Sequence, residues 1–163
     1  SLHDALPIYG TVAACLPSGW RIIAREELLR LGLPEETVAA FQNDTPHAGQ
    51  LDTITVTKEP LNSDLSTTDY SAASVLAVSS LPDYSLIDTQ TVTIDGKSAQ
   101  LHVFSSRPSP DSALRRYYQV SAVHEKVGYS FTGSFPLSVT ESEAAQVVFI
   151  LKNVSFSDPK GKK

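Results

Sequence analysis

Alternating apolar and polar residues in the second half of the chain predict four consecutive β-strands. Residues 90–103 alternate on both sides of Asp95-Gly96, a dipeptide that favours the type I′ turn of a β-hairpin. Residues 115–124 and 129–135 alternate in the same way, and the few residues between them predict a second hairpin connection. Because strands joined by hairpins pair antiparallel, this half of the chain predicts an antiparallel sheet.

The first half of the chain predicts two more strands and two short helices. Residues 9–15 and 52–58 have strand-forming compositions, and turn formers follow the first of them. Residues 25–31 are strong helix formers, so a helix is expected there. Pro34 followed by two glutamates is typical of the first turn of a helix, and we expect that helix to end near Asn43.

Two further helices are predicted from their capping motifs. Ser66 and Asp69 have the spacing of a capping box, and Thr140 and Glu143 form a complete T-x-x-E box. The apolar faces expected for these helices consist of Tyr70, Ala73, Ala77 and Leu81 in the first, and of Ala144, Val147, Val148 and Leu151 in the second. Such helices bury their apolar sides against a sheet, so the sequence predicts an α+β fold. We expect an antiparallel sheet flanked by helices on both faces, an α/β/α sandwich.

The composition excludes several classes of protein. A chain of 163 residues suits one domain, and 41% hydrophobic and 19% charged residues are close to globular averages. A net charge of -5 argues against nucleic acid and against anionic membrane surfaces as partners. The longest apolar runs, such as residues 147–151, are far shorter than the ~20 residues that cross a bilayer. A single cysteine excludes an internal disulfide and a multi-cysteine metal site.

Residues 9–156 are predicted to form a single domain. Residues 1–8 resemble translated adaptor sequence and are interpreted as a non-native or disordered lead-in, with a genuine extended lead-in as the alternative. The sequence contains no Met and begins with Ser, so we expect a truncated N-terminus. A signal peptide or a membrane tether in a missing N-terminal region stays open. Residues 157–163 are expected to form a basic, flexible tail.

No motif identifies a catalytic residue, a metal site or a cofactor. Residues 128–133 have the spacing G-x-S-x-x-G, which differs from a nucleophile elbow, and they lie in a predicted strand. The four histidines form no H-E-x-x-H motif and no short ligand pair, and the chain has neither a calcium-binding loop nor a Walker A motif. We therefore predict no catalytic residues, no metal, no cofactor and no enzymatic activity.

Two features are candidates for binding or modification. Adjacent cationic and aromatic residues are enriched at recognition surfaces, and one strand has four of them, Arg115, Arg116, Tyr117 and Tyr118. The alternative is a strand with outward Arg and Tyr side chains. Residues 12–15 fit a bacterial lipobox, which would make Cys15 a lipidation site. Because turn residues follow Cys15 without a linker, we favour a buried structural thiol.

Several short motifs follow one another along residues 9–156. They are LPSGW at 16–20, LPDY at 81–84, IDGK at 94–97, VGYSFT at 127–132 and VSF at 154–156. In their order and spacing the chain resembles the PsbP-like superfamily, which includes PsbP proteins and bacterial DcrB-like domains. The resemblance implies an antiparallel sheet between helices, an extracytoplasmic location in bacteria, and a binding or accessory role without known catalysis.

These observations predict a non-enzymatic binding or accessory domain that is secreted, periplasmic or held at the cell envelope. Its partner is expected to be a protein. Two alternatives stay open: an enzyme of unrecognised type with a pocket between sheet and helices, and a structural subunit of a photosystem-like or envelope assembly. A deep cleft with converging titratable groups would favour the enzyme, and a large exposed apolar patch would favour the structural subunit.

Overall fold

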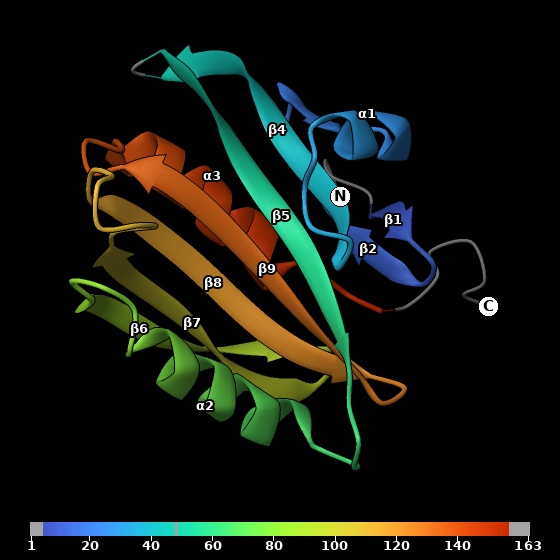
Figure 1. Ribbon diagram of the computed structural model, residues 1–163. Helices are drawn as coiled ribbons and strands as arrows, with labels where there is room; N and C mark the ends of the chain where they lie inside the picture. Colours follow the sequence, from blue (N-terminus) through green and yellow to red (C-terminus); the bar gives the residue numbers. More distant parts are fainter. Residues whose placement is uncertain (1–4, 48, 157–163) are drawn as a thin grey trace.

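One antiparallel sheet of seven strands runs through the described part of the chain, in the order β3-β4-β5-β9-β8-β7-β6 (Figure 1). The computed structural model describes residues 5–47 and 49–156. Along the chain the elements are β1 (Leu6–Tyr9), β2 (Val12–Ala14), β3 (Trp20–Ile22), α1 (Arg25–Arg30), β4 (Thr37–His47), β5 (Gln50–Pro60), α2 (Thr67–Val78), β6 (Ser85–Ile94), β7 (Lys97–Ser106), β8 (Arg115–His124), β9 (Val127–Pro136) and α3 (Glu141–Lys152). All neighbouring strands of the large sheet pair antiparallel, which confirms the predicted sheet.

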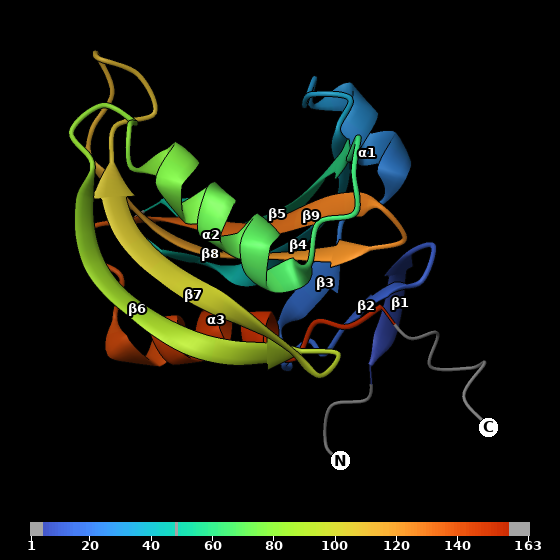
Figure 2. The same cartoon turned by 90° about the horizontal axis from the view of Figure 1, so that it is seen from below.

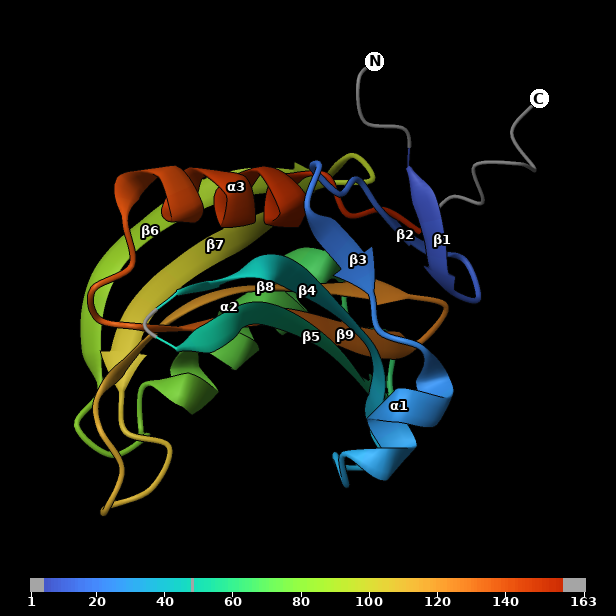
Figure 3. The same cartoon turned by 90° about the horizontal axis from the view of Figure 1, so that it is seen from above.

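Helices cover both faces of this sheet, as Figures 2 and 3 show from opposite sides. Helix α3 lies along one face, and α1 and α2 lie on the other. We call these the α3 face and the α2 face. The predicted α+β sandwich is therefore confirmed. In residues 5–47 and 49–156, no helix has the length and apolarity needed to cross a membrane.

The α3 face of the sheet carries the main hydrophobic core. Alternate strand residues point toward α3, among them Leu101, Val120 and Phe131, and each is almost completely buried. Helix α3 contributes Val147 and Leu151, as its spacing predicted. Burying each of these large side chains stabilises the fold by about 1.5–3 kcal/mol. The α3 face is thus where the sheet gains its packing stability.

The prediction of a helix over residues 34–43 is wrong, because most of this segment belongs to strand β4. Pro34 and the two glutamates form a turn in which the Thr37 N–H donates to the Pro34 carbonyl at 2.9 Å. Strand β4 lies between β3 and β5 and is covered on both sides: Ala40 packs against α1, whereas Phe41 joins the main core. A segment buried on both faces is stable as an inner strand, and its neighbours override the local helix signal.

Helix α2 buries a different stripe from the one predicted. Its N-cap is as expected, since the Ser66 side chain accepts from the Asp69 N–H at 3.0 Å. Tyr70 is buried, but so are Thr67 and Ser71, which were not assigned to the inner face. The remaining three residues of the predicted face, Ala73, Ala77 and Leu81, are exposed. The helix therefore turns mainly hydroxyl-bearing side chains toward the sheet, and Val75 and Val78 on the same side are only partly buried.

Hydroxyl groups of α2 bind the backbone where β7 and β8 separate. The ladder between these two strands spans only part of each of them. Beyond it, Ser71 Oγ accepts a hydrogen bond from the Gln100 N–H at 2.9 Å. Thr67 Oγ1 accepts one from the Val123 N–H at 3.0 Å. These side chains satisfy backbone donors that have no strand partner, and buried donors of this kind must be satisfied. This is the physical reason that the inner face of α2 is polar.

Two glycines of β9 are required by close contacts. A Cβ atom at Gly128 would lie 2.3 Å from Cζ of Tyr70, and one at Gly133 would lie 2.7 Å from the Phe135 ring. At Gly133 the strand register continues without interruption, so the close approach involves no bulge.

The described part of the chain starts with a short hairpin. Residues 6–8, within the predicted lead-in 1–8, belong to β1, which pairs with β2. Ala13 of β2 exchanges two backbone hydrogen bonds with Ser155, at 2.8 and 2.9 Å, so this hairpin lies beside the end of the domain. At residues 6–8 the lead-in is therefore an ordered strand and not a disordered segment. The expectations for residues 1–4 and for the tail 157–163 lie outside the described residues.

Candidate functional site

The four candidate binding residues at the start of β8 lie on two different faces of the sheet. Arg115 and Tyr117 belong to the α2 face, whereas Arg116 and Tyr118 belong to the α3 face. Tyr118 is only 4% exposed and packs edge-on against Phe135, with ring centroids 5.6 Å apart. Successive side chains of a strand alternate between faces, so the four residues form two pairs on opposite faces and not one surface.

A hollow of about 630 Å³ opens at the end of the sheet where β8 begins and β9 ends. The β7–β8 loop and the turn from β9 into α3 form it, and both lie at the left end of the sheet in Figure 1. Its lining residues are Arg107, Ala113, Leu114, Arg115, Pro136, Leu137 and Ser138. We call it the arginine hollow, because its lining combines two arginines with apolar residues and contains no carboxylate. Its volume is within the range of ligand pockets, about 300–1,000 Å³.

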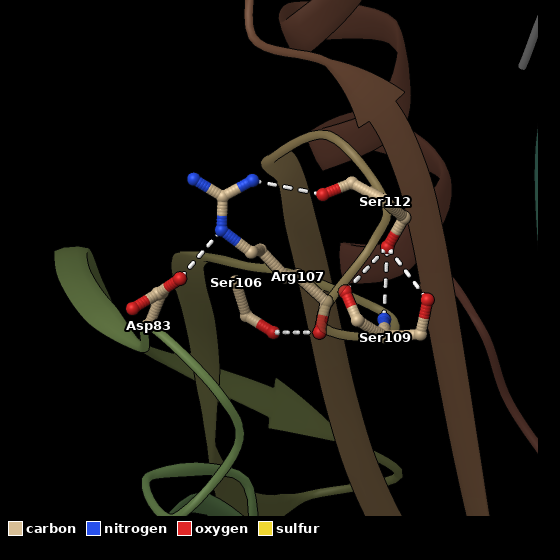
Figure 4. Close-up of polar contacts among 5 residues, drawn as sticks. All are labelled: Asp83, Ser106, Arg107, Ser109 and Ser112. Atoms are coloured by element: carbon tan, nitrogen blue, oxygen red, sulfur yellow. Dashed lines mark hydrogen bonds and ion pairs between the residues drawn. The ribbon is translucent and has the colours of Figure 1, made fainter.

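Arg107 is held in one orientation by two segments (Figure 4). Its Nε donates to the Asp83 carboxylate at 2.5 Å, and its Nη1 donates to the Ser112 carbonyl at 2.8 Å. The Arg107 backbone N–H also donates to the Pro82 carbonyl at 3.0 Å, which ties the end of β7 to the segment after α2. Because these bonds fix the guanidinium in advance, a ligand would meet a charge that needs little further ordering.

The loop opposite Arg107 is organised by two serines. Ser112 Oγ accepts from the Ser109 N–H and donates to the Ser109 carbonyl, both at 2.8 Å, as Figure 4 shows. The Ser112 N–H donates to the same carbonyl at 3.1 Å. These bonds close a compact turn that holds the Ser112 carbonyl where it binds Arg107. The 109–112 turn thus helps to orient the Arg107 guanidinium.

Arg115 is the second positioned arginine of the hollow. Its Nε donates to Ser134 Oγ at 2.7 Å, across the β8–β9 ladder. Both guanidinium groups are therefore oriented through Nε. The sequence indicates Arg115 as a candidate but not Arg107, because residues 105–111 have no periodic pattern and Asp83 is distant along the chain. The one local signal is that Pro108 follows Arg107, which indicates a loop but does not identify Asp83 as the partner of Arg107.

An aromatic cluster continues the α2 face beside Arg115. The Phe104 ring stacks on Tyr117, with centroids 5.2 Å apart, and contacts the rings of Tyr84 and His102. His102 Nε2 lies 2.7 Å from the Tyr84 hydroxyl, whereas His102 Nδ1 has no hydrogen-bond partner among the described residues. His102 is 1% exposed, and burial lowers its pKa. The environment thus favours the neutral imidazole.

Strands β5, β9 and β8 present rows of hydroxyl and amide side chains on the α2 face. Thr132 of β9 lies opposite Thr55 on one side and Gln119 on the other. Gln119 Nε2 donates to Thr132 Oγ1 at 2.9 Å, and the Ser121 and Ser130 hydroxyls lie 2.8 Å apart. This part of the face is polar and uncharged, and its groups bind one another.

Two adjoining hollows lie along α1 and differ in chemistry from the arginine hollow. They measure about 400 and 320 Å³ and share Arg25 and Glu35. Leucines of α1 line the first, while Tyr9, Glu36 and Lys58 line the second. Lys58 Nζ donates to the Tyr9 hydroxyl at 2.8 Å, and this hydrogen bond raises the pKa of Lys58. Because these linings contain both carboxylates and cations, neither positive nor negative charge dominates in them.

The other residues considered from the sequence lie apart from these hollows. Cys15 directly follows the buried strand β2 and is partly exposed, where a buried thiol was expected. His124 stacks on Phe156, with ring centroids 5.0 Å apart, and His3 lies outside the described residues. In the part of the chain that the structure describes, no three His, Cys, Asp or Glu residues gather as a metal site.

Comparison with known proteins identifies the fold. No family model and no curated protein matches the chain. LpqN of Mycobacterium tuberculosis, described as involved in cell envelope biogenesis, is similar at a TM-score of 0.61 and 15% identity, over 88% of this chain and 82% of LpqN. Cyanobacterial PsbP (CyanoP) from Synechocystis is similar at 0.57 and 13%, over 93% of this chain and 92% of CyanoP. A Pseudomonas aeruginosa protein of unknown function gives 0.51 and 13%, over 87% of each chain. The chain therefore has a PsbP-like fold, as its motif order implied.

Proposed function

We propose that this PsbP-like chain is a non-enzymatic accessory domain of the cell envelope, which binds a partner protein through the arginine hollow. The observation that carries the proposal is the arginine hollow itself, where two positioned guanidinium groups meet exposed apolar side chains. Similarity to an envelope-biogenesis protein and to CyanoP supports the location and the accessory role.

The chemistry of the hollow is that of a protein-binding surface. Arginine is among the residues that contribute most to binding at protein interfaces, especially beside apolar contacts that exclude water. Leu137 is 47% exposed at the rim of the hollow, so its apolar surface is available to a partner. Because Arg107 and the 109–112 turn are already ordered, binding would cost little conformational entropy on this side.

The proposal is tested in cells that express the full-length gene product. A photo-cross-linking amino acid is placed at Leu137, at the rim of the hollow, and in a matched control at Leu76, which is 74% exposed on α2. We expect the product in the envelope fraction, and we expect cross-links to one protein from position 137 but not from position 76. Arg107→Gln should abolish those cross-links, and Arg30→Gln, which removes the same charge on α1, should preserve them.

Three results would contradict the proposal. One is a cytoplasmic product. Another is cross-linking that is equal from both positions or insensitive to Arg107→Gln. The third is a turnover activity that survives rigorous purification and is lost in hollow variants, which would support the enzyme alternative instead.

A further inference from the structure

We infer that the arginine hollow binds a peptide segment in which a carboxylate lies beside an aliphatic side chain. This inference rests on the proposed function and adds the chemistry of the partner. It is carried by the juxtaposition of positioned arginines and an exposed apolar wall in one hollow. Neither feature alone would select this ligand.

The charge of the lining selects an anion. Arg107 and Arg115 line the hollow, and none of its lining residues is a carboxylate. The hollows along α1 instead contain Glu35 and Glu36 beside their cations. In a protein of net charge -5, a lining with positive residues alone is a local reversal of sign. Charge complementarity of this kind guides a partner to one site.

The geometry of Arg107 selects a small anionic group. Its Nε is bound to Asp83 and its Nη1 to the Ser112 carbonyl, while its Nη2 makes no hydrogen bond among the described residues. The two N–H groups of Nη2 and the second N–H of Nη1 thus suit a small planar group such as a carboxylate. Asp83 also balances part of the Arg107 charge, so a group with one negative charge is favoured over a polyanion.

The apolar wall requires a second feature in the ligand. Leu114, Leu137 and Pro136 line the same hollow as the arginines. A free carboxylate would leave this surface in contact with water, whereas an aliphatic side chain next to the carboxylate would cover it. Burying such surface contributes about 25 cal/mol per Å². The hollow therefore matches a Leu-Asp or Asp-Leu sequence better than an isolated acidic group.

Nucleic acids and anionic membranes fit these observations less well. Both present many negative charges, and the net charge of -5 repels them over a Debye length of about 8–10 Å. A short acidic and aliphatic peptide has little charge beyond the hollow. We therefore assign a peptide of a partner protein as the occupant.

Three matched peptides test the inference by NMR titration of the whole chain. They are terminally blocked Gly-Leu-Asp-Leu-Gly, its Asn analogue, and Gly-Gly-Asp-Gly-Gly. We expect the first to shift the amides of Ala113, Leu114 and Leu137. The Asn analogue should bind about tenfold more weakly, since a charge-assisted hydrogen bond is worth at least this factor. Gly-Gly-Asp-Gly-Gly should also bind about tenfold more weakly, because it leaves the apolar wall uncovered. Raising the salt concentration should weaken the binding of the two Asp peptides but not that of the Asn analogue.

Two variants with matched controls complete the test. Arg107→Gln should weaken binding of Gly-Leu-Asp-Leu-Gly about tenfold, and Arg30→Gln should change it less than twofold. Leu137→Ser, which leaves the Arg107 hydrogen bonds in place, should weaken it several-fold, whereas Leu76→Ser should have no effect. Thermal unfolding of each variant checks that the fold is retained.

The inference is overturned if none of the peptides shifts the hollow amides at millimolar concentration, or if the Asp and Asn peptides bind equally. Stronger shifts with inorganic phosphate or with phosphatidylglycerol vesicles would reassign the hollow to a phosphate group and also overturn it. If the peptides fail but cross-linking from position 137 still depends on Arg107, the partner chemistry is wrong and the proposed function stands. If cross-linking fails while the peptides bind as expected, the partner chemistry stands and the proposed function is wrong.

Discussion

The two faces of the central sheet are built from the same strands but differ in chemistry. On the α3 face, strands β7, β8 and β9 place Leu101, Val120 and Phe131 in one apolar core. On the α2 face, the alternate residues of the same strands include His102, Gln119 and hydroxyl side chains. One face stabilises the fold by packing. The other attaches its helix through hydrogen bonds and presents the polar groups that surround the arginine hollow.

The difference separates stability from recognition. The residues that line the arginine hollow lie outside the main core, so they can change without removing core contacts. Arg115 and Tyr117 are neighbours of core residues along β8, yet they face the opposite side. The same strand can thus carry both roles, because its side chains alternate with period two.

Removing a large side chain from the α3 face should have the largest effect. Phe131→Ala should lower the free energy of unfolding by about 3–5 kcal/mol, because it loses buried apolar surface and leaves a cavity. Urea unfolding followed by circular dichroism measures this change. Leu76→Ala on exposed α2 is the control and should change stability by less than about 0.5 kcal/mol. Comparable losses in both variants would contradict the packing role of the α3 face.

A methyl group at Gly128 should break the contact between β9 and α2. Gly128→Ala places a Cβ 2.3 Å from Cζ of Tyr70, so the ring and its hydrogen bond to Glu59 must move. We expect a loss of about 1–3 kcal/mol, the usual cost of overpacking. A double-mutant cycle with Tyr70→Ala provides the check, since the cost of Gly128→Ala should largely disappear once the ring is gone. Additive losses would show that the ring contact is not the cause.

Removing a hydroxyl from α2 should have a smaller effect. Thr67→Val keeps the side-chain shape but leaves the Val123 N–H without its acceptor, so we expect a loss of about 1–2 kcal/mol. Hydrogen exchange of the Val123 amide should become faster. Thr68→Val is the matched control, because its hydroxyl binds the Ser98 carbonyl from an exposed position and should matter less. Equal losses in the two variants would contradict the special role of the buried hydroxyl.

The smallest expected effect is the pH dependence that His102 contributes. Burial lowers its pKa in the folded state, so the unfolded chain binds its proton at a higher pH. Stability from this group is complete above the unfolded pKa of about 6.5, and it falls as the pH drops from there toward the lower folded pKa. Urea unfolding between pH 7.5 and about 5.5 measures the slope.

The variant His102→Gln should unfold with a weaker pH dependence in the same window, because glutamine binds no proton. His124→Gln is the control, since that ring stacks on Phe156 at the opposite end of β8 and is not buried in the aromatic cluster. A slope that persists in His102→Gln, or that disappears in His124→Gln, would assign the effect to another group.

Parts of this division could be read from the sequence. The alternation predicted β7 and β8 as strands, whose apolar residues Leu101, Tyr118 and Val120 lie in the core, and the same alternation separates Arg115 from Arg116. The arginine hollow could not be predicted. It depends on Arg107 meeting Asp83, and on the turn after β9 lying beside the β7–β8 loop. Neither contact leaves a pattern in the residues around it.

By itself the sequence determined the hairpins, the capped helix α3 and the antiparallel sheet. These depend on interactions within a few residues, such as the turn at Asp95-Gly96 and the bonds between Thr140 and Glu143. The tertiary structure alone decided that β4 is a strand and that α2 turns hydroxyl groups inward. In both cases the deciding partners lie outside the segment itself: strands on both sides of β4, and backbone donors where β7 and β8 separate. Local propensity is weak compared with the cost of leaving such groups unsatisfied.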